Sequence, residues 1–123
     1  NFNFSQTDKE IEADKFYLGT AIINLISNAV KYGGTIIDIY YNFDNNTNEH
    51  IITVKDNGIG IQKKHYKLIF EKFYRISEKY THNYKGLGLG LYYSAQIVKA
   101  HKGNLQVESK INQGSIFTIK IPN

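Results

Sequence analysis

The stretch Asn24-Leu-Ile-Ser-Asn28-Ala-Val-Lys31-Tyr32 ends a segment whose apolar residues recur every three or four positions. This spacing places the apolar side chains on one side of a helix, which we predict to run from about Asp14 to Tyr32. Asp14 is a suitable N-cap, and the following Gly33-Gly34 ends the helix. The two asparagines and the lysine are four and three residues apart, so they lie together beside the apolar face.

Outward from this helix, four segments alternate apolar and polar residues in the manner of strands: residues 35–43, 50–56, 105–108 and 115–121. A second amphipathic helix is expected from about Leu89 to Lys102, with Gly103 as its stop. Residues 61–75 fit short helices, and residues 76–85 are polar and without periodicity, which indicates a mobile loop. Strand pairs with helices between them predict an α+β fold with helices on one face of a mixed sheet.

The composition limits the possible classes of protein. A chain of 123 residues with 41% hydrophobic and 14% aromatic residues can fill the core of one domain, residues 1–123. The absence of cysteine excludes disulfides and thiolate metal sites and suits a reducing compartment. No apolar run approaches the roughly 20 residues that span a bilayer. Because the sequence begins without methionine, we expect it to be an excised piece whose parent carries any membrane segment.

The net charge of +4 raises the possibility of nucleic-acid binding. Seven of the fifteen Lys and Arg residues fall between Lys63 and Lys85, beside the glycine segments, rather than along one helix face. We therefore expect no nucleic-acid partner. Two explanations of the basic segment stay open: a solvated helical face, or a positive potential around a polyphosphate.

The polar edge of the first helix has the chemistry of a magnesium and phosphate site. Asn24 and Asn28 offer neutral carbonyl oxygens, which suit a hard ion that also binds water and phosphate oxygens. Lys31 adds a point charge for phosphate. Taken alone, the same residues also fit an ordinary polar helix edge.

The segment Asp56-Asn-Gly58-Ile-Gly60 follows a predicted strand. Asn-Gly favours a tight turn, and the segment alone fits one. Alternatively, the Asp56 carboxylate accepts a hydrogen bond from the exocyclic amine of adenine, and the glycines allow close approach. Guanine presents a carbonyl at that edge, so a carboxylate would discriminate against it.

The segment Gly86-Leu-Gly88-Leu-Gly90-Leu91 opens the second helix. Glycines there allow successive N–H groups to point at an anion, and the helix dipole favours negative charge. The spacing matches neither a Walker loop nor a dinucleotide motif, and a flexible helix entry is the alternative. In Phe70-Glu-Lys-Phe73-Tyr-Arg75, the arginine precedes the polar segment, which could carry it to terminal phosphates. The histidines lack metal-ligand spacing, so we interpret them as structural or surface residues.

Together, these four motifs resemble the catalytic, ATP-binding domain of sensor histidine kinases, within the gyrase–Hsp90–histidine kinase–MutL superfamily. The resemblance extends from about Asp14 to Pro122 and implies a two-layer α/β sandwich of the Bergerat type, with a mixed, mostly antiparallel sheet. It implies ATP and Mg²⁺ as cofactors, with an ATP lid at about 76–85. The site residues it implies are Asn28 and Asn24 for magnesium, Lys31 and Arg75 for phosphates, and Tyr32, Asp56, Gly58, Gly60, Gly86, Leu87, Gly88, Leu89 and Gly90 for the nucleotide.

Two departures from the family pattern are visible. The last glycine motif usually has threonine where this chain has Leu87, and the first motif usually ends in Ser/Thr-Pro, where this chain has Gly33-Gly34. Branches that hydrolyse ATP carry glutamate at the position of Asn24, and an amide cannot act as a base. The resemblance therefore implies that an imidazole from another domain attacks the γ-phosphoryl group.

The acceptor histidine is expected outside this chain. Family acceptors are followed by a carboxylate, whereas Tyr66, Asn83 and Lys102 follow the last three histidines. The resemblance implies a dimerisation and histidine-phosphotransfer domain in the same protein and a response regulator receiver domain downstream. It also implies a monomeric isolated domain on the cytoplasmic side and a homodimeric parent anchored in the inner membrane.

Two other functions stay open at this point. One is an anti-sigma-factor-like serine kinase of the same superfamily, which phosphorylates a partner protein. The other is a non-enzymatic, degenerate nucleotide-sensing module. The aromatic motif that ends at Arg75 favours the histidine kinase, and the intact Asn28 and Asp56 disfavour the degenerate module.

Overall fold

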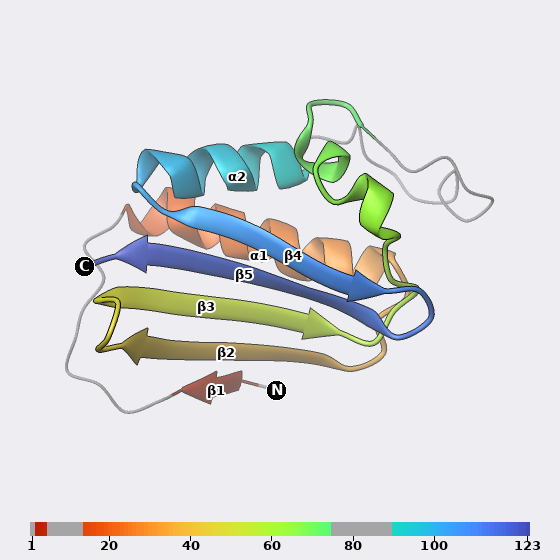
Figure 1. Cartoon of the computed structure of the whole chain (residues 1–123), viewed down its shortest axis with the longest axis horizontal. Helices are drawn as coiled ribbons and strands as arrows, with labels where there is room; N and C mark the ends of the chain where they lie inside the picture. The colour runs from red at the N-terminus through yellow and green to blue at the C-terminus, as the bar shows by residue number, and fades with distance from the viewer. Residues whose placement is uncertain (1, 5–13, 75–89) are drawn as a thin grey trace.

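A computed structural model describes residues 2–4, 14–74 and 90–123. The described elements form a two-layer α+β sandwich (Figure 1). Their bounds, in chain order, are β1 Phe2–Phe4, α1 Lys15–Lys31, β2 Ile37–Asp44, β3 Glu49–Asp56, the 3₁₀ turns η1 Lys63–His65 and η2 Leu68–Phe70, α2 Gly90–Ala100, β4 Asn104–Lys110 and β5 Gly114–Pro122.

The strands form one sheet in the order β1-β2-β3-β5-β4. β1 runs parallel to β2, and the other neighbours are antiparallel. Both helices lie against the same face of this sheet (Figure 1). The predicted mixed, mostly antiparallel sheet with helices on one face is therefore confirmed. The strand β1 was not predicted, because three residues are too few to show a period.

The core lies between the helices and the inner face of the sheet. Apolar residues of α1 meet the inward-facing residues of β3 and β5, and Val98 of α2 completes the layer. The buried members of this core are Leu18, Leu25, Ala29, Ile52, Val54, Ile69, Val98, Phe117, Ile119 and Ile121. Burial of such side chains supplies most of the driving force for folding.

Helix α1 begins and ends where the sequence predicts. The Asp14 side chain caps it by accepting a hydrogen bond from the Tyr17 N–H at 3.1 Å. At the other end, Gly33 has a φ of 85°, and its N–H and that of Gly34 donate to carbonyls of the last turn. This is a Schellman motif, and it explains why glycine occupies that position.

Helix α2 ends earlier than predicted. The expected end was Lys102, but the helix ends at Ala100 because Lys102 itself takes the left-handed conformation, with a φ of 60°. Gly103 is needed for a different reason: a Cβ there would lie 2.4 Å from the carbonyl oxygen of Lys120 on β5. The predicted helix start at Leu89 and the predicted loop at 76–85 lie outside the described residues.

The two phenylalanines of the predicted aromatic motif differ in environment. Phe70 packs on the core, with its ring 6.3 Å from that of Phe117 in an edge-to-face arrangement. Phe73 is 60% exposed and has a φ of 66°. The prediction of short helices is confirmed, because η1 and η2 fall within 61–75.

His50 occupies the core at the end of the sheet where β3 begins. It is fully buried, and its Nδ1 and Nε2 lie 2.9 Å from the Tyr41 hydroxyl and 3.0 Å from Asn123 Oδ1. Burial raises the pKa of the Tyr41 hydroxyl. His65 and His101 are also hydrogen-bonded within the fold. The interpretation of these three histidines as structural residues is confirmed.

Within the residues that the structure describes, no helix is long and apolar enough to cross a membrane. The same described ranges contain no group of three or more His, Cys, Asp or Glu side chains arranged to hold a metal ion. A metal in this part of the chain would therefore need other ligands, such as the amide oxygens considered next.

Candidate nucleotide site

One end of the sandwich brings together the predicted site residues that the structure describes. The end of α1 reaches the end of β3 through a hydrogen bond from the Ile59 N–H to the Tyr32 carbonyl, at 3.1 Å. In the middle of α1, Asn24 Nδ2 donates to the carbonyl of Gly90, the first residue of α2, at 3.4 Å. The first, second and last motifs thus meet. Arg75 and the segment from Gly86 to Leu89 lie outside the described residues.

Asp56 is the buried ionisable group of this site. Its side chain is 7% exposed, and Oδ1 accepts a hydrogen bond from the Gly58 N–H at 2.8 Å. Burial raises the pKa of the Asp56 carboxyl, and hydrogen bonds from the backbone N–H groups of Gly58 and Ser115 partly offset the rise. A carboxylate has room for about four hydrogen bonds. These two donors therefore leave it acceptor capacity for a ligand.

The two glycines of the second motif have clear packing roles. A Cβ at Gly58 would lie 2.4 Å from the carbonyl oxygen of Tyr32. A Cβ at Gly60, whose φ is 77°, would lie 2.0 Å from the carbonyl oxygen of Lys110. Both positions therefore need glycine for the fold itself. The additional role of these glycines in nucleotide contact stays a prediction.

Asn57 is a residue of the site that the sequence analysis did not single out. Its Oδ1 accepts hydrogen bonds from the N–H groups of Thr35 and Ile36, both at 2.9 Å, and its Nδ2 donates to Thr35 Oγ1. Asn57 thereby holds the loop after α1 against the end of β3. The Asn-Gly pair was interpreted only as a turn, and its partners lie more than twenty positions away.

The polar edge of α1 suits the metal that the family pattern implies. Asn24, Asn28 and Lys31 are all half-buried, and they flank the buried residues of the helix. No hydrogen bond joins the Asn28 side chain to another residue in the described ranges, so its amide oxygen is available to a ligand. Asn24 already donates through Nδ2, and a metal would take its Oδ1. Amide oxygens of this kind fit Mg²⁺.

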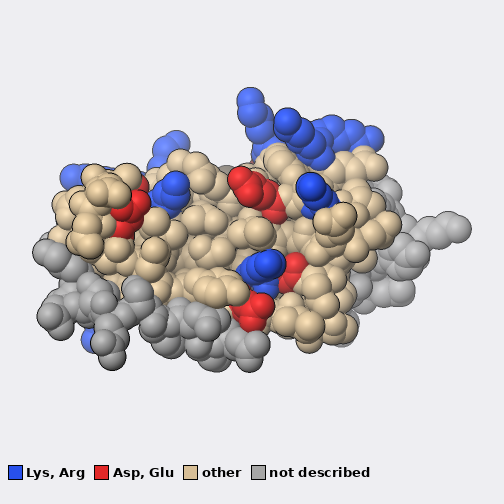
Figure 2. All heavy atoms as spheres, turned by 60° about the horizontal axis from the view of Figure 1, so that its bottom comes forward, with Lys and Arg blue, Asp and Glu red and all other residues tan. Residues whose placement is uncertain are grey.

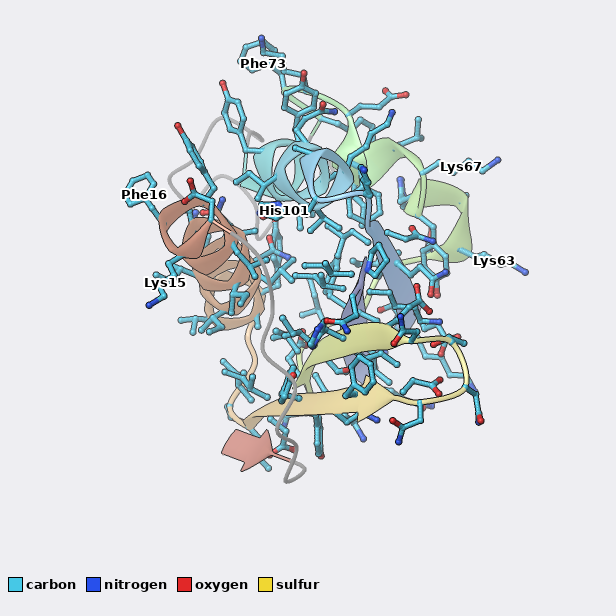
Figure 3. The ribbon with its side chains drawn as sticks, turned by 90° about the vertical axis from the view of Figure 1, so that its left-hand side faces the viewer. Lys15, Phe16, Lys63, Lys67, Phe73 and His101 are labelled. Carbon is cyan, nitrogen blue, oxygen red and sulfur yellow. The ribbon has the colours of Figure 1, made fainter. Side chains whose placement is uncertain are left out.

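Charged side chains are unevenly spread around the molecule. The space-filling view shows basic side chains gathered along one edge, whereas acidic and basic groups are mixed over the rest of that face (Figure 2). Lys63 and Lys67 point outward, on the side of the molecule away from α1 (Figure 3). These two lysines therefore fit a solvated surface better than a phosphate site beside Asn28. Lys31 remains the described lysine that belongs to the site edge.

The fold and these motifs together define the class of protein. The chain belongs to the histidine kinase-, DNA gyrase B- and HSP90-like ATPase family, whose family model matches residues 13–123. Among its relatives are sensor protein RprX of Bacteroides fragilis, 40% identical over 98% of this chain, and sensor protein SrrB of Staphylococcus aureus, 32% identical over 99%. The chain spans only 24% and 21% of the lengths of these two relatives.

Solved structures of histidine kinases have the same fold. The mycobacterial sensor histidine kinase MprB matches with a TM-score of 0.80 and 26% identity, covering 98% of this chain and 80% of MprB. Full-length ShkA in complex with AMPPNP matches with a TM-score of 0.84 and 26% identity, covering 98% of this chain and 24% of ShkA. The resemblance inferred from the four motifs is thus confirmed: this is an ATP-binding domain of the sensor histidine kinase type.

Proposed function

We propose that this chain binds ATP with Mg²⁺ and donates the γ-phosphoryl group to a histidine in a separate domain of its parent protein. The observation that carries the proposal is the Asp56 carboxylate, which is buried with spare acceptor capacity at the same end as the amides of α1. Its adenine role has the support of the family, and of the AMPPNP bound to the similar kinase ShkA. Residues 1–123 then form the catalytic domain alone, with a lid at about 76–85.

Each side chain has a specific task in this proposal. Asp56 accepts a hydrogen bond from the adenine amine, and Asn28, assisted by Asn24, would hold the metal. Mg²⁺, when bound, offsets the negative charge that the terminal phosphates carry and develop during transfer. Lys31 and Arg75 contact phosphate oxygens, and Tyr32 lies near the nucleotide. The glycines and leucines from Gly86 to Gly90 complete the phosphate contact.

The transfer itself needs a nucleophile from outside the chain. Asn24 stands where a hydrolytic branch has glutamate, and an amide cannot take a proton from water. A histidine nitrogen of the acceptor domain forms a bond to the γ-phosphorus while the bond from that phosphorus to the bridging oxygen breaks. ADP leaves with the electron pair, and the imidazole proton passes to a base in the acceptor domain. The phosphohistidine then supplies a response regulator.

The partners in this proposal follow the relatives, most of whose length lies outside this chain. They are a dimerisation and histidine-phosphotransfer domain of the same protein and, downstream, a receiver domain. We propose that the isolated domain is a monomer on the cytoplasmic side of a homodimeric parent anchored in the inner membrane. The described part of the chain offers no histidine free of internal hydrogen bonds to act as acceptor.

Calorimetric titration with ATP tests the binding half of the proposal. Wild type is expected to bind in the presence of Mg²⁺ and less tightly with a chelator. Asp56→Asn should weaken binding about 100-fold, because the amide loses the charged acceptor and presents a donor to the purine amine. Asp38→Asn is the matched control, since Asp38 pairs with the neighbour of Asp56 in the β2–β3 register, on the opposite face. Equal binding by all three proteins would refute the adenine role.

Radiolabelled ATP tests the transfer half. With the parent's dimerisation domain added, the label is expected on that domain and to be lost in acid, as phosphohistidine is. An acid-stable label on a separate partner would instead indicate the serine-kinase alternative. Rapid labelling of a histidine in this chain alone would contradict an external acceptor.

A further inference from the structure

Ser109, near the end of β4, is the centre of a hydrogen-bond cluster. Its Oγ accepts from the Ile61 N–H at 2.7 Å and lies 2.8 Å from the Gly114 carbonyl and 2.7 Å from Ser115 Oγ. A hydroxyl has one proton, and a carbonyl can only accept. Ser109 therefore donates to Gly114, and the Ser115 hydroxyl donates to Ser109. This assignment directs the Ser115 hydroxyl proton toward Ser109.

Ser115 connects this cluster to the candidate adenine site. It lies opposite Asp56 in the β3–β5 register and opposite Ser109 in the β4–β5 register. Its backbone N–H lies close enough to the Asp56 carboxylate to help lower the pKa of that group. Gly114 packs closely against the backbone of Asp56, since a Cβ at position 114 would lie 1.9 Å from the Asp56 carbonyl oxygen. A shift of Ser109 would therefore move the groups that hold Asp56.

Tyr66 fixes Ser109 from the other side. The Tyr66 hydroxyl donates to the Ser109 carbonyl and accepts from the Ser109 N–H, the latter at 2.7 Å. Its neighbours Lys63 and Lys67 point outward into solvent (Figure 3), whereas the tyrosine hydroxyl reaches the sheet. Tyr66 is thus the anchor of the η1–η2 segment on β4. These contacts join residues 43 positions apart in the chain.

We propose that Ser109 and Tyr66 are positioning residues that set the direction of the Asp56 carboxylate and thereby the preference for adenine over other purines. The inference rests on the proposed function of Asp56. Neither residue needs to contact the nucleotide. A hydrogen bond between a carboxylate and an exocyclic amine depends strongly on direction. A displaced carboxylate therefore weakens adenine recognition while leaving the phosphate contacts unchanged.

The test compares ATP with inosine triphosphate, which has a carbonyl in place of the amine. Affinities are measured by competition against a fluorescent ATP analogue for the wild type, Ser109→Ala and Tyr66→Phe. We expect both variants to lower the ATP preference about tenfold, through weaker ATP binding at nearly constant inosine triphosphate binding. Ser109→Thr keeps the hydroxyl and should restore the preference.

Tyr41→Phe is the matched control. It removes a tyrosine hydroxyl that is also hydrogen-bonded, to His50, at the opposite end of the sheet. It should lower the unfolding temperature but leave the ATP preference unchanged. A merely structural role for Ser109 and Tyr66 would make their variants behave like this control.

The outcomes separate the two proposals. A wild-type preference that neither Ser109→Ala nor Tyr66→Phe alters, or that Tyr41→Phe lowers equally, would overturn the positioning role alone. A wild-type chain that fails to bind ATP would overturn the proposed function and this inference with it. If Ser109→Ala does not fold, Tyr66→Phe and Ser109→Thr decide the question.

Discussion

Strand β3 buries a polar side chain near each of its ends, and the two side chains differ in their hydrogen-bond partners. His50, near the start, is fully buried and has a side-chain partner at each ring nitrogen. Asp56, at the end, is also buried, but its carboxylate is held by the backbone, with a hydrogen bond from the Gly58 N–H at 2.8 Å. They lie six positions apart on the same face, a distance of about 20 Å. Both ring nitrogens of His50 are hydrogen-bonded within the fold, whereas the Asp56 carboxylate keeps acceptor capacity for a ligand.

The comparison shows that burial of a polar group does not by itself indicate function. The His50 side chain packs within the core, with its ring 4.9 Å from that of Phe43. Burial of the Asp56 carboxylate instead costs desolvation free energy, which the raised pKa of this group reflects.

The largest effect is expected from Gly114→Ala, which breaks the Asp56 end of the sheet. The residue has a φ of 111°, and the new Cβ would lie 1.9 Å from the Asp56 carbonyl oxygen. We expect a loss of more than about 3 kcal/mol in the free energy of unfolding. Chemical denaturation measures it, and a loss below about 1 kcal/mol would show that β5 can move away freely.

His50→Leu removes the buried hydrogen bonds near the start of β3. It leaves the Tyr41 hydroxyl and the Asn123 amide without their buried partner, so the free energy of unfolding should fall by about 2–3 kcal/mol. The ATP affinity of the folded protein should not change, because the site lies about 20 Å away. Calorimetry and denaturation on the same samples separate the two quantities, and a selective loss of ATP binding would contradict the division between the ends.

Asp56→Asn sharpens the comparison through pH. Since the pKa of Asp56 is raised on folding, the native state holds this proton more tightly than the unfolded chain. The free energy of unfolding of the wild type therefore falls as pH rises from the ordinary aspartate pKa through the raised one, because the folded protein gives up this proton less readily. The asparagine variant has no such loss, so its stability relative to wild type should improve over that range. Urea unfolding between pH 4 and pH 7 measures the difference, and a pH-independent difference would refute the burial effect.

The smallest effect is expected from Gly19→Ala in α1. A Cβ there meets nothing within 4 Å, so alanine should stabilise the helix by about 0.5–1 kcal/mol. This variant raises global stability without touching either end of β3. Unchanged ATP affinity with a higher unfolding temperature would show that stability and binding vary independently. Lower stability would contradict the open space around a Cβ at Gly19.

Local signals in the sequence were sufficient to predict that α1, α2 and the strands β2 to β5 exist, but not β1. The cap at Asp14, the stop at Gly33 and the apolar period between them predict α1 nearly to the residue. Strand bounds differ by up to two residues: β2 begins two residues later than predicted, and pairing with β5 extends β4 two residues beyond its clear alternation. The predicted end of α2 was wrong because Lys102, rather than a glycine, takes the positive φ.

The site was only partly predictable. Asn28 and Asp56 carry their chemistry in the side chain itself, so motif and spacing indicate them. Asn57, Ser109 and Tyr66 act through partners that are distant in sequence, and their residue types are common on any surface. No local pattern distinguishes such a residue from its neighbours. The contacts that hold a carboxylate in place appear only once the strands are paired.

The two hydrogen bonds between the Tyr66 hydroxyl and the Ser109 backbone have a further consequence for the behaviour of this domain in concentrated solution. β4 lies at the border of the described sheet, where open peptide groups invite a strand from another molecule. The tyrosine hydroxyl occupies both peptide groups of Ser109 and so interrupts that row. Removing it should therefore make the protein more prone to aggregate through this border, even under conditions in which the fold survives.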